Sequence, residues 1–178
     1  LIAVITTFLL NLSSEQGNIT KLNGIDIWWE SHGDINNPTA LLIMGLNSNS
    51  KVWSDQYIEN LVVNNLHVLV FDNRDIGKST WITEEPGLIT FIKYLPNFLQ
   101  VYFVEFIFGF IFDEEGKFNM ENPAPAEYNL SDMAMDGIAL LDHLEISEAH
   151  IIGASMGGMI AQVMALEHSD RVKSLTLF

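Results

Sequence analysis

The chain has 178 residues, which is room for one domain but not comfortably for two. Hydrophobic residues make up 48 % of it, so it can bury a sizeable core and is not a disordered chain. A formal net charge of −15 argues against a nucleic-acid partner, because phosphates would be repelled. The absence of cysteine excludes disulfides, thiolate metal sites and a cysteine nucleophile.

Residues 1–14 form an apolar N-terminal segment. Its apolar run, residues 1–12, has the length of a signal-peptide core and is shorter than the roughly 20 residues that span a bilayer. It is either the remnant of a signal or anchor, or a plain hydrophobic arm. The compartment is therefore open between the cytoplasm and an exported or membrane-associated location.

Both ends of the chain are expected to be truncated. The first residue is Leu1 rather than Met, and the last residues, 172–178, are apolar and strand-like. A domain that stopped inside such a strand would leave a sheet edge unpaired. Residues 15–178 are thus expected to form a partial domain that ends after the strand following residues 156–168.

Apolar patterns predict an alternation of strands and helices. Alternation favours a half-exposed strand over residues 24–31, and continuous apolar runs favour buried strands over residues 39–44, 67–71, 150–152 and 172–178. Helical spacing predicts helices over residues 52–64, 131–144 and 156–168, and Ser131 is the expected cap of the second. This order indicates an α/β fold with a mostly parallel sheet and crossover helices.

An apparent insertion at about residues 86–122 interrupts this order. Its central part, residues 88–112, holds seven of the chain's eleven phenylalanines. Lys93 and Glu105 interrupt the segment and argue against a membrane-spanning helix. We expect a cap over the sheet that favours apolar substrates, and the alternative is association with a membrane surface through residues 88–112.

The pattern Gly153-x-Ser155-x-Gly157 carries the strongest chemical signal. It sits between a predicted buried strand and a predicted helix, which is the context of a nucleophile elbow. Ser155 is the predicted catalytic nucleophile, raised above the sheet by a sharp turn. Gly153 and Gly157 are predicted where a side chain would collide with that turn. The Met156 N–H, at the start of the helix, is a predicted oxyanion donor.

Several segments resemble one known family. Residues 153–162 (GASMGGMIAQ), 72–79 (DNRDIGKS) and 128–134 (YNLSDMA) are similar to motifs of the α/β-hydrolase fold family, in particular to aclacinomycin methylesterase-like serine ester hydrolases. The resemblance implies the α/β-hydrolase fold and a hydrolase acting on small carboxylic esters through an acyl-enzyme. It also implies that no cofactor and no metal are needed. Carbon–carbon hydrolases and perhydrolases of this fold use the same serine.

Two turns next to the predicted strands have expected roles. Gly45 lets the backbone approach the substrate where the fold has its oxyanion loop, and the Leu46 N–H is the second predicted donor. A plain glycine turn is the alternative there. Residues 72–79 could suggest a metal or phosphate site, but we expect a structural turn whose charges pair internally and whose Gly77 takes a positive φ.

The catalytic triad is expected to be incomplete. In this fold the acid and the histidine follow the serine, yet only 23 residues follow Ser155. Their one histidine, His168, lies about 20 Å along the helix and cannot be the base. The other four histidines are expected at the surface or in packing. The chain is therefore expected to be inactive as it stands, or to be a non-catalytic binding protein or fragment that retains the fold.

Overall fold

The computed structural model describes residues 17–83 and 126–178. The chain divides into two compact units, Leu1–Ile82 with Tyr128–Phe178 and Thr83–Glu127, and every element described below belongs to the first. The predictions for residues 1–14 and for the insertion at about residues 86–122 lie outside the described residues. In the described ranges no helix combines the length and apolarity that crossing a membrane requires.

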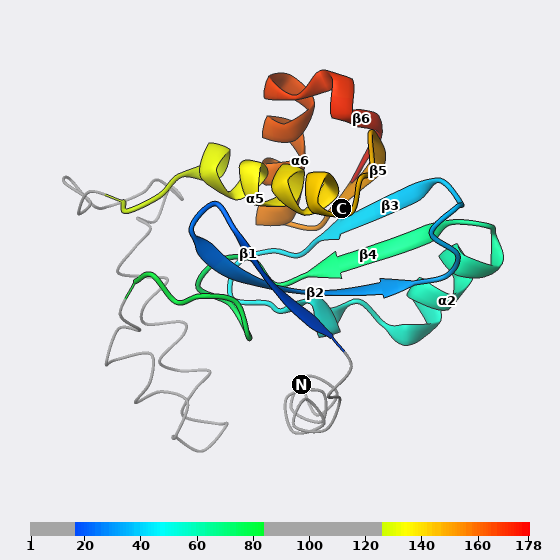
Figure 1. The fold of residues 1–178 in the computed structure, drawn as a ribbon, viewed down its shortest axis with the longest axis horizontal. Helices are drawn as coiled ribbons and strands as arrows, with labels where there is room; N and C mark the ends of the chain where they lie inside the picture. The colour runs from blue at the N-terminus through cyan, green and yellow to red at the C-terminus, as the bar shows by residue number, and fades with distance from the viewer. Residues whose placement is uncertain (1–16, 84–125) are drawn as a thin grey trace, which may run out of the picture. The chain divides into compact units, whose positions relative to one another are not determined.

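The described strands form a single sheet in the order β1-β2-β4-β3-β5-β6 (Figure 1). Strands β3, β4, β5 and β6 pair in parallel, and β1 and β2 run antiparallel to their neighbours. This arrangement confirms the predicted mostly parallel sheet. The strands are β1 (Asn18–Leu22), β2 (Ile25–His32), β3 (Thr39–Ile43), β4 (His67–Phe71), β5 (Ala149–Gly153) and β6 (Val172–Leu177).

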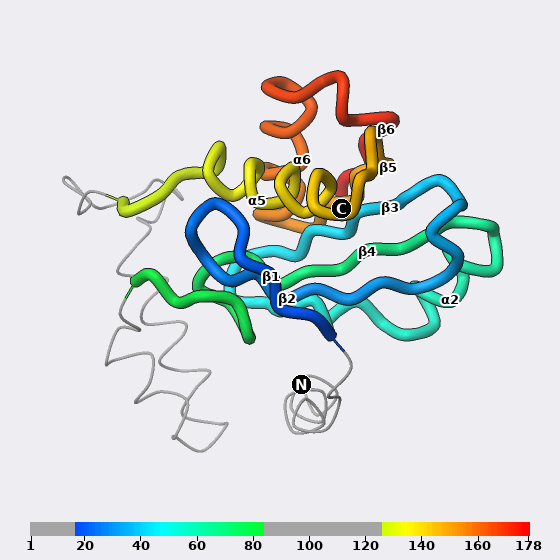
Figure 2. Tube along the Cα trace, in the orientation of Figure 1, coloured from blue at the N-terminus to red at the C-terminus, as the bar shows by residue number. Residues whose placement is uncertain are grey.

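Helices cover both faces of the sheet, as Figure 2 allows the reader to follow along the chain. Alternate strand residues such as Leu41 and Ile151 pack toward α5 (Leu130–His143) and α6 (Met156–Glu167). Their neighbours Leu42 and Ile152 pack toward α2 (Asp55–Val63). Each fully buried side chain of this size contributes about 1.5–3 kcal/mol, so the two-sided core fixes the register of the central strands.

A short hairpin at the amino end of the described chain was not predicted. Strand β1 pairs with β2 through a two-residue turn, with Asn23 at φ 50° and Gly24 at φ 85°. Two positive φ values are what a tight hairpin requires, and Asn-Gly is the dipeptide that meets this requirement most easily. The strand NITKL is short and mostly exposed, so its apolar pattern alone gave no indication of it.

The start of one helix, predicted at residue 52, and the cap of another differ from the prediction. Helix α2 begins after Ser54, whose hydroxyl accepts a hydrogen bond from the Tyr57 N–H, and a short 3-10 turn, η1 (Ser50–Val52), precedes it. The prediction that Ser131 caps α5 is wrong: Asn129 is the cap and forms a reciprocal capping box with Asp132. The Ser131 hydroxyl instead donates to Glu167.

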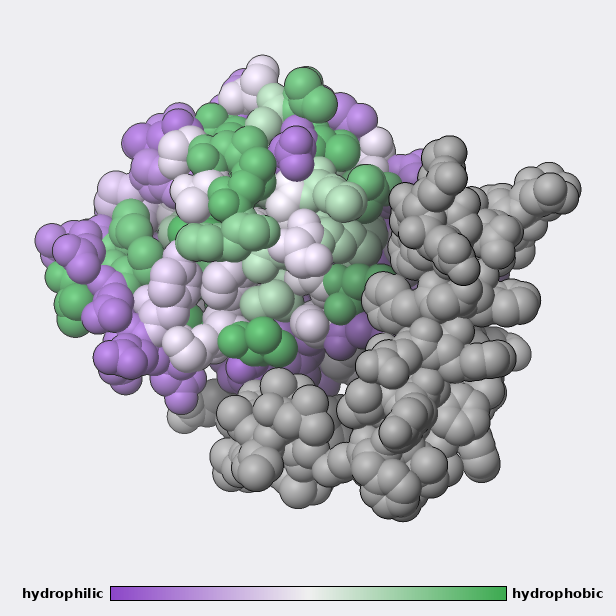
Figure 3. Space-filling model, turned by 180° about the vertical axis from the view of Figure 1, so that it is seen from behind, coloured by the Kyte–Doolittle hydropathy of each residue, from purple (hydrophilic) through white to green (hydrophobic). Residues whose placement is uncertain are grey.

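Strand β6 differs from the buried strand that its sequence predicted. It follows a second 3-10 turn, η2 (Ser169–Arg171), and among the described residues it pairs only with β5. From Lys173 to Leu177 every residue is exposed. Seen from behind, the described surface carries apolar patches between polar ones (Figure 3), and the exposed apolar side chains include Leu175, Leu177 and Phe178.

Candidate active site

Ser155 occupies a sharp turn between β5 and α6. Its φ of 54° and ψ of −123° are unusual for a residue with a side chain, and such strain is most often found at functional sites. The turn is held by the Gly157 N–H donating to the Ala154 carbonyl at 2.8 Å, and by the Gly158 N–H donating to the Ser155 carbonyl at 2.8 Å. The side chain of Ser155 is exposed, so an incoming molecule can reach it.

Two glycines leave space that the turn needs. A Cβ atom at Gly153 would lie 2.4 Å from the Gly157 carbonyl oxygen. A Cβ atom at Gly157 would lie 2.2 Å from the carbonyl oxygen of Ile43, at the end of β3. Both distances are far below van der Waals contact, so the close approach of α6 to β3 and β5 depends on the missing side chains.

The loop after β3 lies directly against the serine. A Cβ atom at Gly45 would lie 2.9 Å from the Ser155 Cβ and 3.3 Å from its Oγ. Neither the Leu46 N–H nor the Met156 N–H donates a hydrogen bond to another described residue. The structure therefore places the loop glycine against the serine, and it leaves the N–H groups of the next residue in each turn, Leu46 and Met156, without a partner among the described residues.

The turn over residues 72–79 is structural, but its arginine does not pair within the turn as expected. Arg74 pairs with Asp136 of α5 through Nε–Oδ2 at 2.7 Å and Nη2–Oδ1 at 2.8 Å. Asp72 accepts bonds from the N–H and hydroxyl of Ser50 and from the Lys78 N–H. The expectation of internal pairing was wrong because it considered only neighbours in sequence, whereas the fold brings α5 beside the turn. Gly77 has the predicted positive φ, 56°.

The buried Asp136 and the half-buried Tyr128 complete a polar cluster that the sequence did not reveal. The hydrogen bond from Asp136 is the main reason that the pKa of Arg74 is raised, so the guanidinium is held in its charged form. The Tyr128 ring lies 5.0 Å from the Arg74 guanidinium carbon. Burial, aided by a hydrogen bond to Asp75, raises the pKa of Tyr128 to about 12. The one signal of this cluster in the sequence was an aspartate, Asp136, on the buried face of a predicted helix.

None of the chain's five histidines contacts Ser155, and all five are described. His67 is fully buried at the start of β4, where its ring nitrogens bond to Ser31 at 2.7 Å and Thr39 at 3.0 Å. His168 caps the far end of α6. The remaining three lie on β2, α5 and β5, each beside a polar partner: His32 near Glu30, His143 near Thr20 and His150 near Ser174. The arrangement thus supplies a serine and backbone donors without a neighbouring imidazole.

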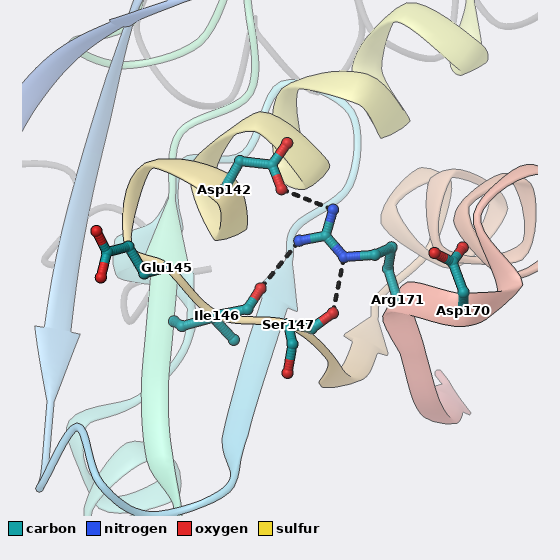
Figure 4. A pocket seen from close by; sticks show the side chains of 6 residues that line it. All are labelled: Asp142, Glu145, Ile146, Ser147, Asp170 and Arg171. Atoms are coloured by element: carbon teal, nitrogen blue, oxygen red, sulfur yellow. Dashed lines mark hydrogen bonds and ion pairs between the residues drawn. The ribbon is translucent and has the colours of Figure 1, made fainter.

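A shallow depression lies at the opposite edge of the sheet from Ser155. Arg171 crosses it and bonds to Asp142 at 2.6 Å, to the Ile146 carbonyl at 2.9 Å and to the Ser147 carbonyl at 2.7 Å (Figure 4). Because these bonds engage the Arg171 guanidinium, the residues around the depression connect α5 to the start of β6. Within residues 17–83 and 126–178, no group of three or more potential metal ligands comes together.

Known proteins provide a comparison for this arrangement. A model of the alpha/beta hydrolase fold matches residues 38–178. Rhodomycin D methylesterase DnrP of Streptomyces peucetius is 27 % identical over 153 residues, which cover 86 % of this chain and 38 % of that protein. Rhodomycin D methylesterase DauP of Streptomyces sp. (strain C5) is 26 % identical over 159 residues, which cover 89 % of this chain and 40 % of that protein.

The fold similarity extends to solved structures. Epoxide hydrolase A from Mycobacterium thermoresistibile superposes with a TM-score of 0.63 at 20 % identity, covering 91 % of this chain and 38 % of that one. At this identity the likeness concerns the fold alone. The chain spans about two fifths of the length of the two methylesterases. Because the family model covers most of the chain, the chain belongs to the alpha/beta hydrolase fold family.

Proposed function

We propose that this chain carries the nucleophile and the oxyanion-binding groups of a serine hydrolase that acts on carboxylic esters. The observation that carries the proposal is Ser155, exposed and strained beside Gly45 and two unbonded backbone N–H groups. Positive φ at a serine between a strand and a helix is how nucleophile elbows present their hydroxyl. The similarity to two proteins named as methylesterases supports an ester as substrate.

The proposed chemistry proceeds through an acyl-enzyme. The Ser155 Oγ bonds to the ester carbonyl carbon, and the Leu46 and Met156 N–H groups hold the oxyanion. Each such donor typically contributes about 3–4 kcal/mol of transition-state stabilisation. The C–O bond to the alcohol then breaks, and the alcohol leaves with the proton that Ser155 gave up. Water hydrolyses the acyl-enzyme and returns a proton to Ser155.

Proton transfer from Ser155 needs a base. We propose that this base is not one of the described residues. A serine hydroxyl is a weak nucleophile until a histidine, oriented by a carboxylate, takes its proton. Because no histidine of this chain contacts Ser155, the residues named here supply attack and oxyanion binding only.

The surface beside Ser155 favours an apolar substrate. Leu46 is 70 % exposed next to Gly45, and Phe178 is 68 % exposed. The Phe178 carbonyl accepts the Ser155 N–H at 3.0 Å, so this residue borders the elbow directly. Its ring meets Trp53 and Tyr57 edge-on, with ring centroids 6.5 and 6.4 Å apart. Exposed apolar residues next to these two contacts would gain from covering an acyl chain or an aromatic alcohol.

A fluorophosphonate probe tests the proposal, because it phosphonylates activated serines. We expect the full-length protein, in which the base is present, to be labelled, and its Ser155→Ala variant to remain unlabelled. Ser174→Ala is the control, because the Ser174 hydroxyl, unlike that of Ser155, has a histidine partner, His150, at 2.7 Å. Labelling that persists in Ser155→Ala and disappears in Ser174→Ala would contradict the proposal. Circular dichroism establishes that each variant is folded.

A non-catalytic binding protein is the second candidate. The absence of any histidine at Ser155 favours it, since a fold without its base can still bind a ligand. A folded full-length protein that fails to react with the probe, and that binds an apolar ester without releasing the alcohol, would establish this alternative. Equilibrium binding of a 4-nitrophenyl ester, followed by the absence of 4-nitrophenolate absorbance, makes the distinction.

A further inference from the structure

Asn73 connects the end of β4 to the loop that carries Gly45. It lies two residues after Phe71, and because β3 and β4 run in parallel, their carboxyl ends meet at one edge of the sheet. The Asn73 side chain is buried, with 2 % of the residue exposed. Its Nδ2 donates a buried hydrogen bond of 2.9 Å to the Met44 carbonyl oxygen.

This bond is one of three that fix consecutive carbonyl groups of the loop. The Ile43 oxygen accepts the Ala154 N–H at 3.0 Å, and the Gly45 oxygen accepts the Ser48 N–H at 3.3 Å. Between them, the Met44 oxygen is the only one of the three held by a side chain. A trans peptide points its N–H opposite to its C=O. Orienting the Met44 carbonyl therefore orients the Gly45 N–H of the same peptide, and so fixes where the loop toward Leu46 begins.

The other end of the Asn73 amide argues against a role in stability alone. Its Oδ1 is buried and has no hydrogen-bond partner among the described residues. A buried acceptor without a partner is unfavourable, and an apolar side chain of similar size would avoid that cost. The neighbouring Asp72 differs, because both of its carboxylate oxygens are engaged. What distinguishes Asn73 is thus the single donor that it directs at the Met44 carbonyl.

We propose that Asn73 is a positioning residue for the oxyanion loop, residues 44–46, acting through the Met44 carbonyl. It touches neither the substrate nor Ser155. Its effect is to hold Gly45 against the serine, where a Cβ atom would be only 2.9 Å from the Ser155 Cβ, and so to keep the Leu46 N–H directed at the oxyanion. The expected effect on the reaction of Ser155 rests on the proposed function, but the effect of the Asn73–Met44 hydrogen bond on the loop can be measured separately.

The test compares two substitutions with a control in the same turn. Asn73→Asp keeps the shape, removes the donor and places a carboxylate oxygen opposite the Met44 carbonyl. Asn73→Leu removes the donor and the unpaired acceptor together. Ser79→Ala is the control, because the Ser79 hydroxyl bonds to the Asp72 carbonyl and the Trp28 N–H and supports the turn without touching the loop.

Amide exchange and chemical shifts of Gly45 and Leu46, measured by NMR, report on the loop. The fluorophosphonate labelling rate reports on Ser155. We expect both Asn73 variants to shift these resonances, to speed amide exchange and to slow labelling by about fivefold or more, the factor that corresponds to one hydrogen bond. Asn73→Leu is expected to do so without losing stability toward urea. Ser79→Ala is expected to lose stability and to leave both loop readouts unchanged.

Several outcomes would overturn the positioning role. One is a pair of Asn73 variants whose loop resonances and labelling match the parent chain. Another is a pair that no longer folds, since Asn73 would then be needed for folding itself. A full-length parent protein that is not labelled, combined with shifted loop resonances in the Asn73 variants, would refute the proposed function and leave the role of the Asn73–Met44 hydrogen bond supported.

Discussion

Replacing Asp136 by asparagine is expected to lower the free energy of unfolding by about 3–5 kcal/mol. Asp136 is 1 % exposed and holds Arg74 by two short bonds, and it also accepts the Asn23 side-chain amide at 3.1 Å. The Arg74 side chain is itself only 9 % exposed. Asparagine keeps the shape of Asp136 but leaves the buried guanidinium without a counter-charge, which is the costly way to break an ion pair.

The magnitude follows from burial rather than from the length of the bonds. The pair between Arg171 and Asp142 is equally short, at 2.6 Å, but the Asp142 side chain is 61 % exposed. Exposed pairs typically contribute no more than about 1 kcal/mol, because water and salt screen the charges. Asp142→Asn, six residues along the same helix, is therefore a matched control that should change stability little.

Urea denaturation followed by circular dichroism at 222 nm measures both variants. The double variant Arg74→Met with Asp136→Leu should recover much of the loss, because an apolar pair needs no counter-charge. If Asp136→Asn destabilises the chain no more than Asp142→Asn does, then burial of the Arg74 pair does not determine its contribution.

Three further predictions concern a glycine contact and two titrations. Gly157→Ala should cost about 3 kcal/mol of stability or more, because its Cβ would meet the Ile43 oxygen at 2.2 Å. Gly158→Ala, whose nearest contact is 3.4 Å, should be neutral or stabilising by up to about 1 kcal/mol; thermal unfolding measures both variants. Burial lowers the pKa of His67, so the unfolded chain takes up a proton there more readily than the folded chain does. Urea midpoints should therefore fall as the pH drops below about 6.5, and less steeply in His67→Gln. Burial raises the pKa of Tyr128 to about 12, so folding favours its neutral form. The contribution of Tyr128 to stability should be complete below about pH 10 and be lost as the pH rises toward 12. The absorbance at 295 nm of the parent chain, minus that of Tyr128→Phe, gives the titration.

Each of these has a result that would contradict it. Equal melting temperatures for Gly157→Ala and Gly158→Ala would mean that α6 does not approach β3 as closely as described. A His67→Gln variant with the same acid sensitivity as the parent would assign that sensitivity to other groups. A difference spectrum for Tyr128 centred near pH 10 would mean that its phenol is not desolvated.

The amino-acid sequence alone determined the alternation of strands and helices and the position of the serine turn. Buried parallel strands read as continuous apolar runs, and a Gly-x-Ser-x-Gly pattern between a strand and a helix has few other structural uses. These signals are local, since each depends on residues within about ten positions of one another. For the same reason the hairpin turn at Asn23 was readable in principle, although the polar strand before it was missed.

The tertiary structure decided what those local signals could not contain. The partner of Arg74 is 62 positions away, at Asp136, and the donor that holds the Met44 carbonyl is 29 positions away, at Asn73. The position of a charged or amide side chain in the sequence does not indicate which of many distant groups it will contact in the fold. The exposure of β6 was likewise decided by which strand pairs beside it, not by its apolar residues. Periodicity determines which elements form, while polar contacts over long sequence distances depend on the way the elements pack.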